Sequence, residues 1–327
     1  MGKMFNVSAS PHIRSGVTTS TIMRDVAIAM IPACAMGVYQ FGFRALLILL
    51  VSTLTCAATE YLYLRFTKRN QGAYECSAIV TGMLIGMNMP AGVPLWIPVI
   101  GGVFAILVVK QVFGGLGQNF MNPALGARCF LFLCYAGHMN AFEIPQKVGA
   151  AVWNYGAASI DGISGATPLA ALKAGETVDL FDAFFGFTGG VIGETSAAMI
   201  LLGAAYMVIR KVISLRIPVA YLLTFSVFVL LFGGRGFDLY YVACELCTGG
   251  LMLGAFFMAT DYVTSPITKN GQLVFGILLG ILTGLFRIYG NNAEGVSYAI
   301  IIANLLVPLI EKVTMPRPFA KGEHLNG

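Results

Sequence analysis

Long apolar runs recur along almost the whole 327-residue chain, and they constrain the fold more than any other feature. A helix needs roughly 20 apolar residues to cross a hydrocarbon core of about 30 Å. Hydrophobic residues make up 57% of the chain and charged residues only 11%, whereas a soluble domain has about 25% charged residues. Most of the protein surface must therefore face something other than water. We expect an all-α integral membrane protein embedded in the lipid bilayer.

The apolar runs predict about ten transmembrane helices. The third and fifth runs are short for a full crossing. The sixth is broken by glycines, so we expect it to begin as a re-entrant half-helix, which is tolerated where protein covers the irregular backbone. The ten runs cover residues 25–41, 45–64, 76–89, 94–112, 124–138, 184–209, 217–232, 239–258, 272–289 and 296–313.

The basic residues predict the topology of the chain in the membrane. Ten spans place both termini on one side, and residues 1–24 lack the apolar core of a cleavable signal peptide. If that side is the cytoplasm, fifteen of the 20 Lys and Arg residues lie inside, as the positive-inside rule expects. The predicted parts are a cytoplasmic segment (1–24), a first membrane repeat (25–138), an external loop (139–183), a second membrane repeat (184–313) and a cytoplasmic tail (314–327).

Short matches between the two halves predict that they form two inverted five-helix repeats. Gly82-Met-Leu-Ile-Gly86 resembles Gly250-Leu-Met-Leu-Gly254, and the ends of spans four and nine are alike at Lys110 and Arg287. Inverted repeats usually enclose a site near the middle of the membrane. Such glycine spacings also arise simply because they let helices pack closely.

The external loop contains Asp161-Gly-Ile-Ser164-Gly165-Ala166-Thr167-Pro168. Gly, Ser, Asp and Pro are common turn formers, so an ordinary turn is one explanation. The spacing also matches D-x-x-[ST]-G-A-T, which resembles the acceptor pattern of flavin transferases. That resemblance implies a covalent FMN, joined to the Thr167 hydroxyl as a phosphoester. We expect an exposed hydroxyl on a flexible chain, with Pro168 preventing a helix from continuing through the segment.

The resemblance extends to other parts of the chain and points to one family of membrane subunits. The chain resembles the D subunit of Rnf ion-translocating electron-transport complexes and the B subunit of the Na⁺-translocating NADH:quinone reductase. The D subunit is the closer match, because this chain reaches its first span by residue 25. The similar segments are Ser10–Gly16, Ile22–Val26, Lys110–Ala124 and Gly189–Ser196.

Asn119 and Asn122 lie in a glycine-rich break between spans four and five. The resemblance implies a second, non-covalent flavin, riboflavin, near this segment, with Asn119, Asn122 and Lys110 as its binding residues. The two amides would also serve simply to turn the chain and to cap span five.

Four carboxylates, Glu60, Glu194, Glu245 and Asp261, fall within or at the edges of apolar runs. Intramembrane carboxylates often mark ion paths, although snorkelling or helix capping explains Glu60 and Asp261 equally well. The three histidines are too dispersed for a metal site. No glycine-rich nucleotide-binding loop opens a βα unit, and the basic residues are too scattered to bind nucleic acid, so we expect neither NAD nor nucleic acid to bind this chain.

Three functional hypotheses follow. The resemblance implies an electron relay in a multi-pass protein of the bacterial inner membrane, working with other Rnf subunits and matured by a flavin transferase. The complex would couple ferredoxin–NAD⁺ electron transfer to Na⁺ or H⁺ movement. A solute transporter or channel with inverted repeats is the second hypothesis, and a scaffold protein with an unused flavin motif is the third.

Overall fold

The computed structural model describes residues 18–68, 76–142, 167–290 and 295–316. In these ranges the regular secondary structure is helical, apart from one antiparallel β-bridge between Pro90 and Val191. The N-terminal half contains α1 (Thr19–Phe41), α2 (Phe43–Phe66), α3 (Ser77–Met87), α4 (Trp96–Phe104), the π-helix η1 (Ala105–Gln111), α5 (Pro123–Cys134) and α6 (Ala136–Met139). The C-terminal half contains α7 (Pro168–Ala174), α8 (Leu180–Phe185), α9 (Ala197–Ile209), α10 (Arg216–Phe232), α11 (Leu239–Cys247), α12 (Leu251–Leu253), the π-helix η3 (Gly254–Met258), α13 (Lys269–Tyr289) and α14 (Val296–Thr314).

The helices coincide with the apolar runs, but fewer of them than predicted have the length of a full crossing. Within the described ranges, α1, α2, α13 and α14 are long and apolar enough to span a membrane, and α11 with α12–η3 makes a fifth if the bent pair is one span. The other apolar helices have 10–17 residues. At 1.5 Å per residue, the 11 residues of α3 rise about 17 Å, which is little more than half of a 30 Å core. The chain is therefore a multi-pass membrane protein with several short helices.

Two runs are interrupted where continuous or re-entrant helices were expected. The sixth run does not begin as a half-helix that continues into the membrane: α8 ends at Phe185, and non-helical residues 186–196 precede α9. The eighth run, predicted as one helix, breaks between Cys247 and Leu251 and bends by 67°. Gly249 and Gly250 both have positive φ at this break, a conformation that costs glycine little.

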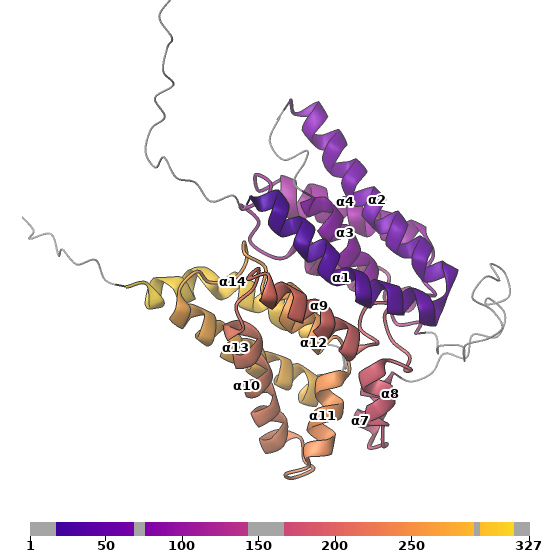
Figure 1. Cartoon of the computed structure of the whole chain (residues 1–327), viewed down its shortest axis with the longest axis vertical. Coiled ribbons are helices and arrows are strands. Elements are labelled where there is room, and N and C mark those ends of the chain that lie inside the picture. Colours follow the sequence, from indigo (N-terminus) through magenta and orange to yellow (C-terminus); the bar gives the residue numbers. More distant parts are fainter. Residues whose placement is uncertain (1–17, 69–75, 143–166, 291–294, 317–327) are drawn as a thin grey trace, which may run out of the picture.

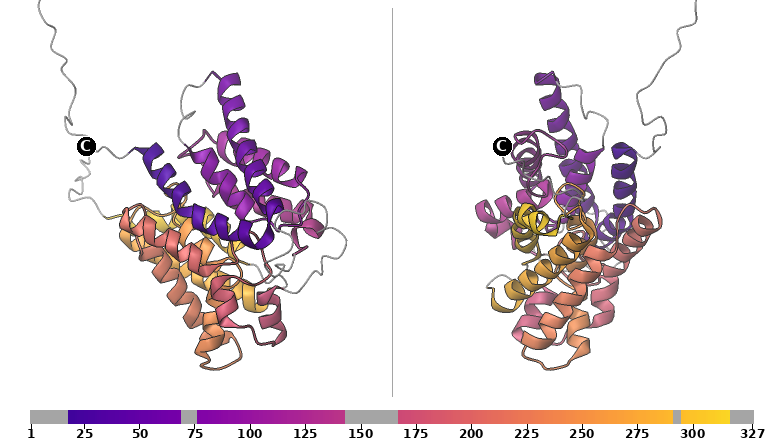
Figure 2. Two further views of the ribbon diagram at one scale, coloured as in Figure 1. Left: turned by 45° about the vertical axis from the view of Figure 1, so that its right-hand side comes forward. Right: turned by 90° about the vertical axis from the view of Figure 1, so that its left-hand side faces the viewer.

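The two halves of the chain occupy two halves of the molecule (Figures 1 and 2). They meet along α1 and α9 and along α5 and α14. Glycines allow close packing within each half. A Cβ on Gly82 would lie 2.5 Å from the Cα of Thr53 in α2, and one on Gly280 would lie 2.8 Å from the backbone nitrogen of Phe225 in α10. Close backbone approach through small residues is the usual way in which helices associate in lipid.

The segment predicted as one external loop, 139–183, contains helices. Thr167 is extended, as expected for the residue before Pro168, and Pro168 also opens a helix, because it stands at the first position of α7, where a missing N–H costs nothing. Asp179 caps the next short helix, α8. In the C-terminal half α8 packs beside α11 (Figure 1), and α7 is bonded at Leu172 to Arg235, just before α11.

Candidate functional site

Thr167, the predicted flavin acceptor, is the N-cap residue of α7. Its backbone is extended (φ −63°, ψ 152°), and its Oγ1 accepts a hydrogen bond from the Ala170 N–H at 3.3 Å. The residue is only 9% exposed, so the expectation of an exposed hydroxyl was wrong. The helix that Pro168 starts ties the hydroxyl to its first turn. Asp161, Ser164, Gly165 and Ala166 lie outside the described residues.

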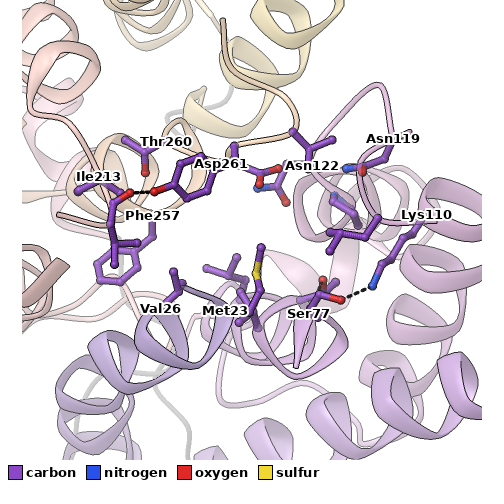
Figure 3. A pocket seen from close by; sticks show the side chains of 18 of the residues that line it. Met23, Val26, Ser77, Lys110, Asn119, Asn122, Ile213, Phe257, Thr260 and Asp261 are labelled. Carbon is purple, nitrogen blue, oxygen red and sulfur yellow. Dashed lines mark hydrogen bonds between the residues drawn. The ribbon is translucent and has the colours of Figure 1, made fainter. Parts of the chain in front are cut away.

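Lys110, Asn119 and Asn122, the predicted riboflavin residues, line one cavity of about 70 Å³ between the two halves of the chain. Figure 3 shows the two amides beside Asp261 along one wall, with Met23 and Ser77 on the opposite wall and Lys110 at one end. The cavity is lined by α1, α3, η1, the 112–122 loop and the segment after η3. Thr167 is not among its lining residues, so the candidate site has two separate parts.

The polar groups around the cavity differ in how fully they are paired. Asn122 accepts a bond from the Ala124 N–H at 3.0 Å and so caps α5. Asn119 donates to the carbonyl of Met121 at 3.1 Å, while its buried Oδ1 has no partner among the residues that the structure describes. The capping interpretation thus holds for Asn122 and leaves Asn119 with a free acceptor. Asp261 accepts from the Thr264 hydroxyl at 3.1 Å, and burial raises the pKa of its carboxyl.

Three buried ion pairs join segments that are distant in the sequence. Lys110 Nζ lies 2.5 Å from Glu60 Oε1, Arg128 Nη1 lies 2.7 Å from Glu194 Oε1, and Arg287 Nη1 lies 3.0 Å from Glu245 Oε2. Glu60 therefore does not snorkel to the membrane surface, which was one interpretation of its place in the sequence. Because these three cations are buried in protein, they also carry no weight in the positive-inside argument, although the bias among the remaining Lys and Arg persists.

Sequence reasoning missed the most densely bonded of these groups, Arg287. Its guanidinium donates to the carbonyls of Glu245 (2.5 Å), Thr248 (2.8 Å) and Gly249 (3.0 Å) at the break between α11 and α12. It also lies over the ring of Phe225, 5.0 Å from the centroid. The glycine pair at 249–250 was a sequence signal for this break, but Gly250 was considered only as part of the Gly250–Gly254 match between the two halves.

Two aromatic residues of the glycine-rich break, Phe113 and Phe120, contact each other. Their rings meet edge to face at 4.6 Å, and both side chains are exposed. Neither lines the cavity, so neither ring is placed to stack on a molecule bound there.

Comparison with known proteins gives one consistent result. The sequence profile of the NQR2, RnfD, RnfE family matches residues 6–320. The D subunit of the Na(+)-translocating ferredoxin:NAD(+) oxidoreductase complex of Acetobacterium woodii is 44% identical, over 95% of this chain and 94% of that protein. The D subunit of the proton-translocating ferredoxin:NAD(+) oxidoreductase complex of Clostridium ljungdahlii is 36% identical, over 97% and 96%. The D subunit of the ion-translocating oxidoreductase complex of Stutzerimonas stutzeri is 37% identical, over 94% of each chain.

Proposed function

The chain belongs to the NQR2, RnfD, RnfE family, and we propose that it is the D subunit of an Rnf complex, which couples electron transfer between ferredoxin and NAD⁺ to ion movement. The observation that carries the proposal is the Asp161-to-Thr167 acceptor pattern, in a chain 44% identical to such a D subunit over 95% of its length. Its partners would be the other Rnf subunits and a flavin transferase. Relatives named for Na⁺ and for protons are similar over nearly equal lengths, so the proposal covers either ion.

Thr167 would hold FMN covalently. A flavin transferase would form the phosphoester by attack of Thr167 Oγ1 on FAD, with AMP as the leaving group and loss of the hydroxyl proton. The local geometry fits this product, because Oγ1 acts as an acceptor toward Ala170 and its proton is not needed in that bond. When bound, FMN supplies one- and two-electron transfer, while the chain holds and orients it.

The test is the flavin content of Thr167 variants. A phosphoester survives denaturation, so the wild-type band should fluoresce under ultraviolet light on a denaturing gel and carry an FMN-sized mass increment. Thr167→Ala should abolish both signals, and Thr167→Ser should restore some of them. Ser164→Ala, which leaves the acceptor in place, should keep flavin. Fluorescence retained in Thr167→Ala would refute the attachment site.

Asn119, Asn122 and Lys110 would bind riboflavin in the cavity between the two halves. The unpaired Oδ1 of Asn119 suits an N–H of a flavin ring. The cavity, at about 70 Å³, is smaller than the ~150 Å³ that admits benzene, so riboflavin would require it to widen. Met23 and Met207 on its wall are side chains that repack easily.

Riboflavin is separable from the covalent flavin by extraction. Changing Asn119 and Asn122 together to Leu should remove extractable riboflavin and leave the FMN on Thr167. Asn119→Leu alone should have most of this effect, since Asn122 is already engaged in capping α5. Wild-type protein without extractable riboflavin would refute the proposal that riboflavin binds in this cavity.

The two halves would be inverted repeats with the termini in the cytoplasm. In support, Lys110 bonds to Ser77 at 2.7 Å and Arg287 to Glu245 at 3.0 Å. Ser77 and Glu245 each lie five residues before the first glycine of the matched G-x-x-x-G segments. A reporter fused after Lys321 should then behave as cytoplasmic and one inserted at Gly175 as exported. The opposite result would reverse the topology and with it the side on which Thr167 is modified.

The alternative functions predict different cofactors and partners. A B subunit of a Na⁺-translocating quinone reductase would carry the same flavin but co-purify with different subunits. A solute transporter or a scaffold would carry no flavin at all. Purification of the native complex therefore distinguishes the first alternative, and flavin content distinguishes the other two.

A further inference from the structure

The helix that begins after Thr167 is packed into the break in the eighth run. Leu169 is buried in the first turn of α7, and its Cδ2 lies 2.6 Å from the point that a Cβ on Gly249 would occupy. Arg287 Nη2 lies 2.9 Å from that same point. The leucine side chain therefore fills the space left by the missing side chain at Gly249, directly beside the guanidinium of Arg287.

The surface that receives Leu169 is held by several helices. The break leaves carbonyl groups without helical partners, and Arg287 of α13 bonds to three of them, those of Glu245, Thr248 and Gly249. Its pairing with Glu245 and its position over Phe225 of α10 fix the guanidinium from two further sides. Because the backbone at Gly249 has φ +65°, a side chain there would be strained as well as crowded.

The far end of α7 is tied to the same half of the protein. Lys173 Nζ donates to the Gly290 carbonyl, and Arg235 Nη2 donates to the Leu172 carbonyl at 3.3 Å. These contacts hold the C-terminal end of the helix. Leu169 is the buried apolar contact in the first turn, about 3 Å along the helix axis from Thr167 at 1.5 Å per residue.

We propose that the break between α11 and α12 is a seat for α7, in which Leu169 packed on Gly249 beside Arg287 fixes the position of the flavin on Thr167 relative to the membrane helices. The proposal rests on the proposed attachment of FMN to Thr167. A helix of seven residues is not stable alone in water, so α7 keeps its orientation only through such contacts. Leu169, Gly249 and Arg287 are thus positioning residues that act on the flavin through α7.

The seat also explains how Thr167 can accept FMN from a transferase although its side chain is buried. A transferase must reach a hydroxyl that is 9% exposed and bonded within α7. Modification therefore requires α7 to leave the seat, and the helix docks afterwards with the flavin attached. Weakening the seat should consequently leave the amount of covalent flavin unchanged while making the flavin more mobile.

The test uses Leu169→Ala in the full-length protein, purified with its complex. The matched control is Leu131→Ala, which removes an equally buried leucine that also packs on a glycine, Gly101, 2.7 Å from its Cβ position. Leu169→Ala should carry as much covalent FMN as the wild type on the denaturing gel. Its time-resolved flavin fluorescence anisotropy should gain a fast component, because the flavin is more mobile. Leu131→Ala should retain the wild-type decay, and Leu169→Met should restore it. A wild-type anisotropy decay in Leu169→Ala would show that Leu169 does not fix the position of the flavin, and would refute the proposal.

Hydrogen exchange gives a second measurement that does not depend on flavin. From the usual cost of a buried Leu→Ala change, the amides of α7 should exchange about 30-fold faster or more in Leu169→Ala and not in Leu131→Ala. Gly249→Ala should have the same local effect. If the wild type carries no flavin, the proposed function fails while exchange still tests the seat. If flavin is present and α7 exchanges equally fast in Leu169→Ala and in the wild type, the proposed docking of α7 is refuted while the proposed function stands.

Discussion

Lys110 and Arg287 lie near the ends of the fourth and ninth apolar runs, one in each half of the chain, and their surroundings differ. Lys110 contacts Glu60 and Ser77 and faces a cavity in which Asn119 has an unpaired acceptor. Arg287 bonds to three backbone carbonyls and Glu245, lies over Phe225, and is covered where Leu169 packs on Gly249. The two cations thus border a cavity in one half of the chain and a closely packed helix break in the other.

This difference matches the two kinds of cofactor that we propose. A ligand held without a covalent bond needs space and unpaired polar groups, which the cavity beside Lys110 provides. A cofactor joined to Thr167 needs a rigid support for its helix, and the bonds of Arg287 to the broken backbone provide that support. The comparison can be tested by removing each cation and measuring the stability of the protein.

The largest effect is expected for Arg287→Met. This change leaves Glu245 as a buried charge without its partner, which typically costs about 3–5 kcal/mol, and it frees three carbonyl groups at the break. We expect a large drop in the thermal unfolding midpoint of the detergent-solubilised protein, or no folded protein at all.

Lys110→Met serves as the comparison for that measurement. Glu60 would retain the bond from Gln111 Nε2 at 2.9 Å, and the adjacent cavity admits water, so the loss should be about 1–3 kcal/mol. Equal losses in the two variants would contradict the distinction between the cavity and the closely packed helix break.

Removing both members of each ion pair should make the difference in stability between the Lys110 and Arg287 variants clearer. Replacing a buried pair with neutral groups of similar size is often nearly neutral, so adding Glu60→Gln to Lys110→Met should recover most of the lost stability. Adding Glu245→Gln to Arg287→Met should recover little, because the carbonyls of Thr248 and Gly249 remain unpaired. A double-mutant cycle on unfolding midpoints measures both couplings, and full recovery at Arg287 would mean that the backbone bonds contribute nothing.

Local patterns predicted the positions of the helices but not the contacts between them. The apolar runs located the membrane helices closely: α10 covers Arg216–Phe232 where 217–232 was expected. The family resemblance grouped Lys110, Asn119 and Asn122 in one site, and the three residues line one cavity. The ion pairs were not predictable, because Glu60 and Lys110 are 50 residues apart and their contact depends on how α2 packs on η1. The packing of α7 was missed for a similar reason, since Leu169 lies against Gly249, which is distant in the sequence.

The smallest expected effect concerns the two cavity asparagines and separates capping from ligand binding. Asn122→Leu removes the N-cap of α5, which usually costs about 1 kcal/mol. Asn119→Leu removes a buried acceptor that has no partner among the described residues, but it also removes the bond to the Met121 carbonyl, so gain and loss should partly cancel. The unfolding midpoint of protein stripped of extractable flavin should therefore fall further in Asn122→Leu than in Asn119→Leu. Protein that retains its extractable flavin should show the opposite order if riboflavin is bound through Asn119, since loss of the ligand then removes its stabilisation. An unchanged order in the two preparations would mean that Asn119 has no ligand to hold.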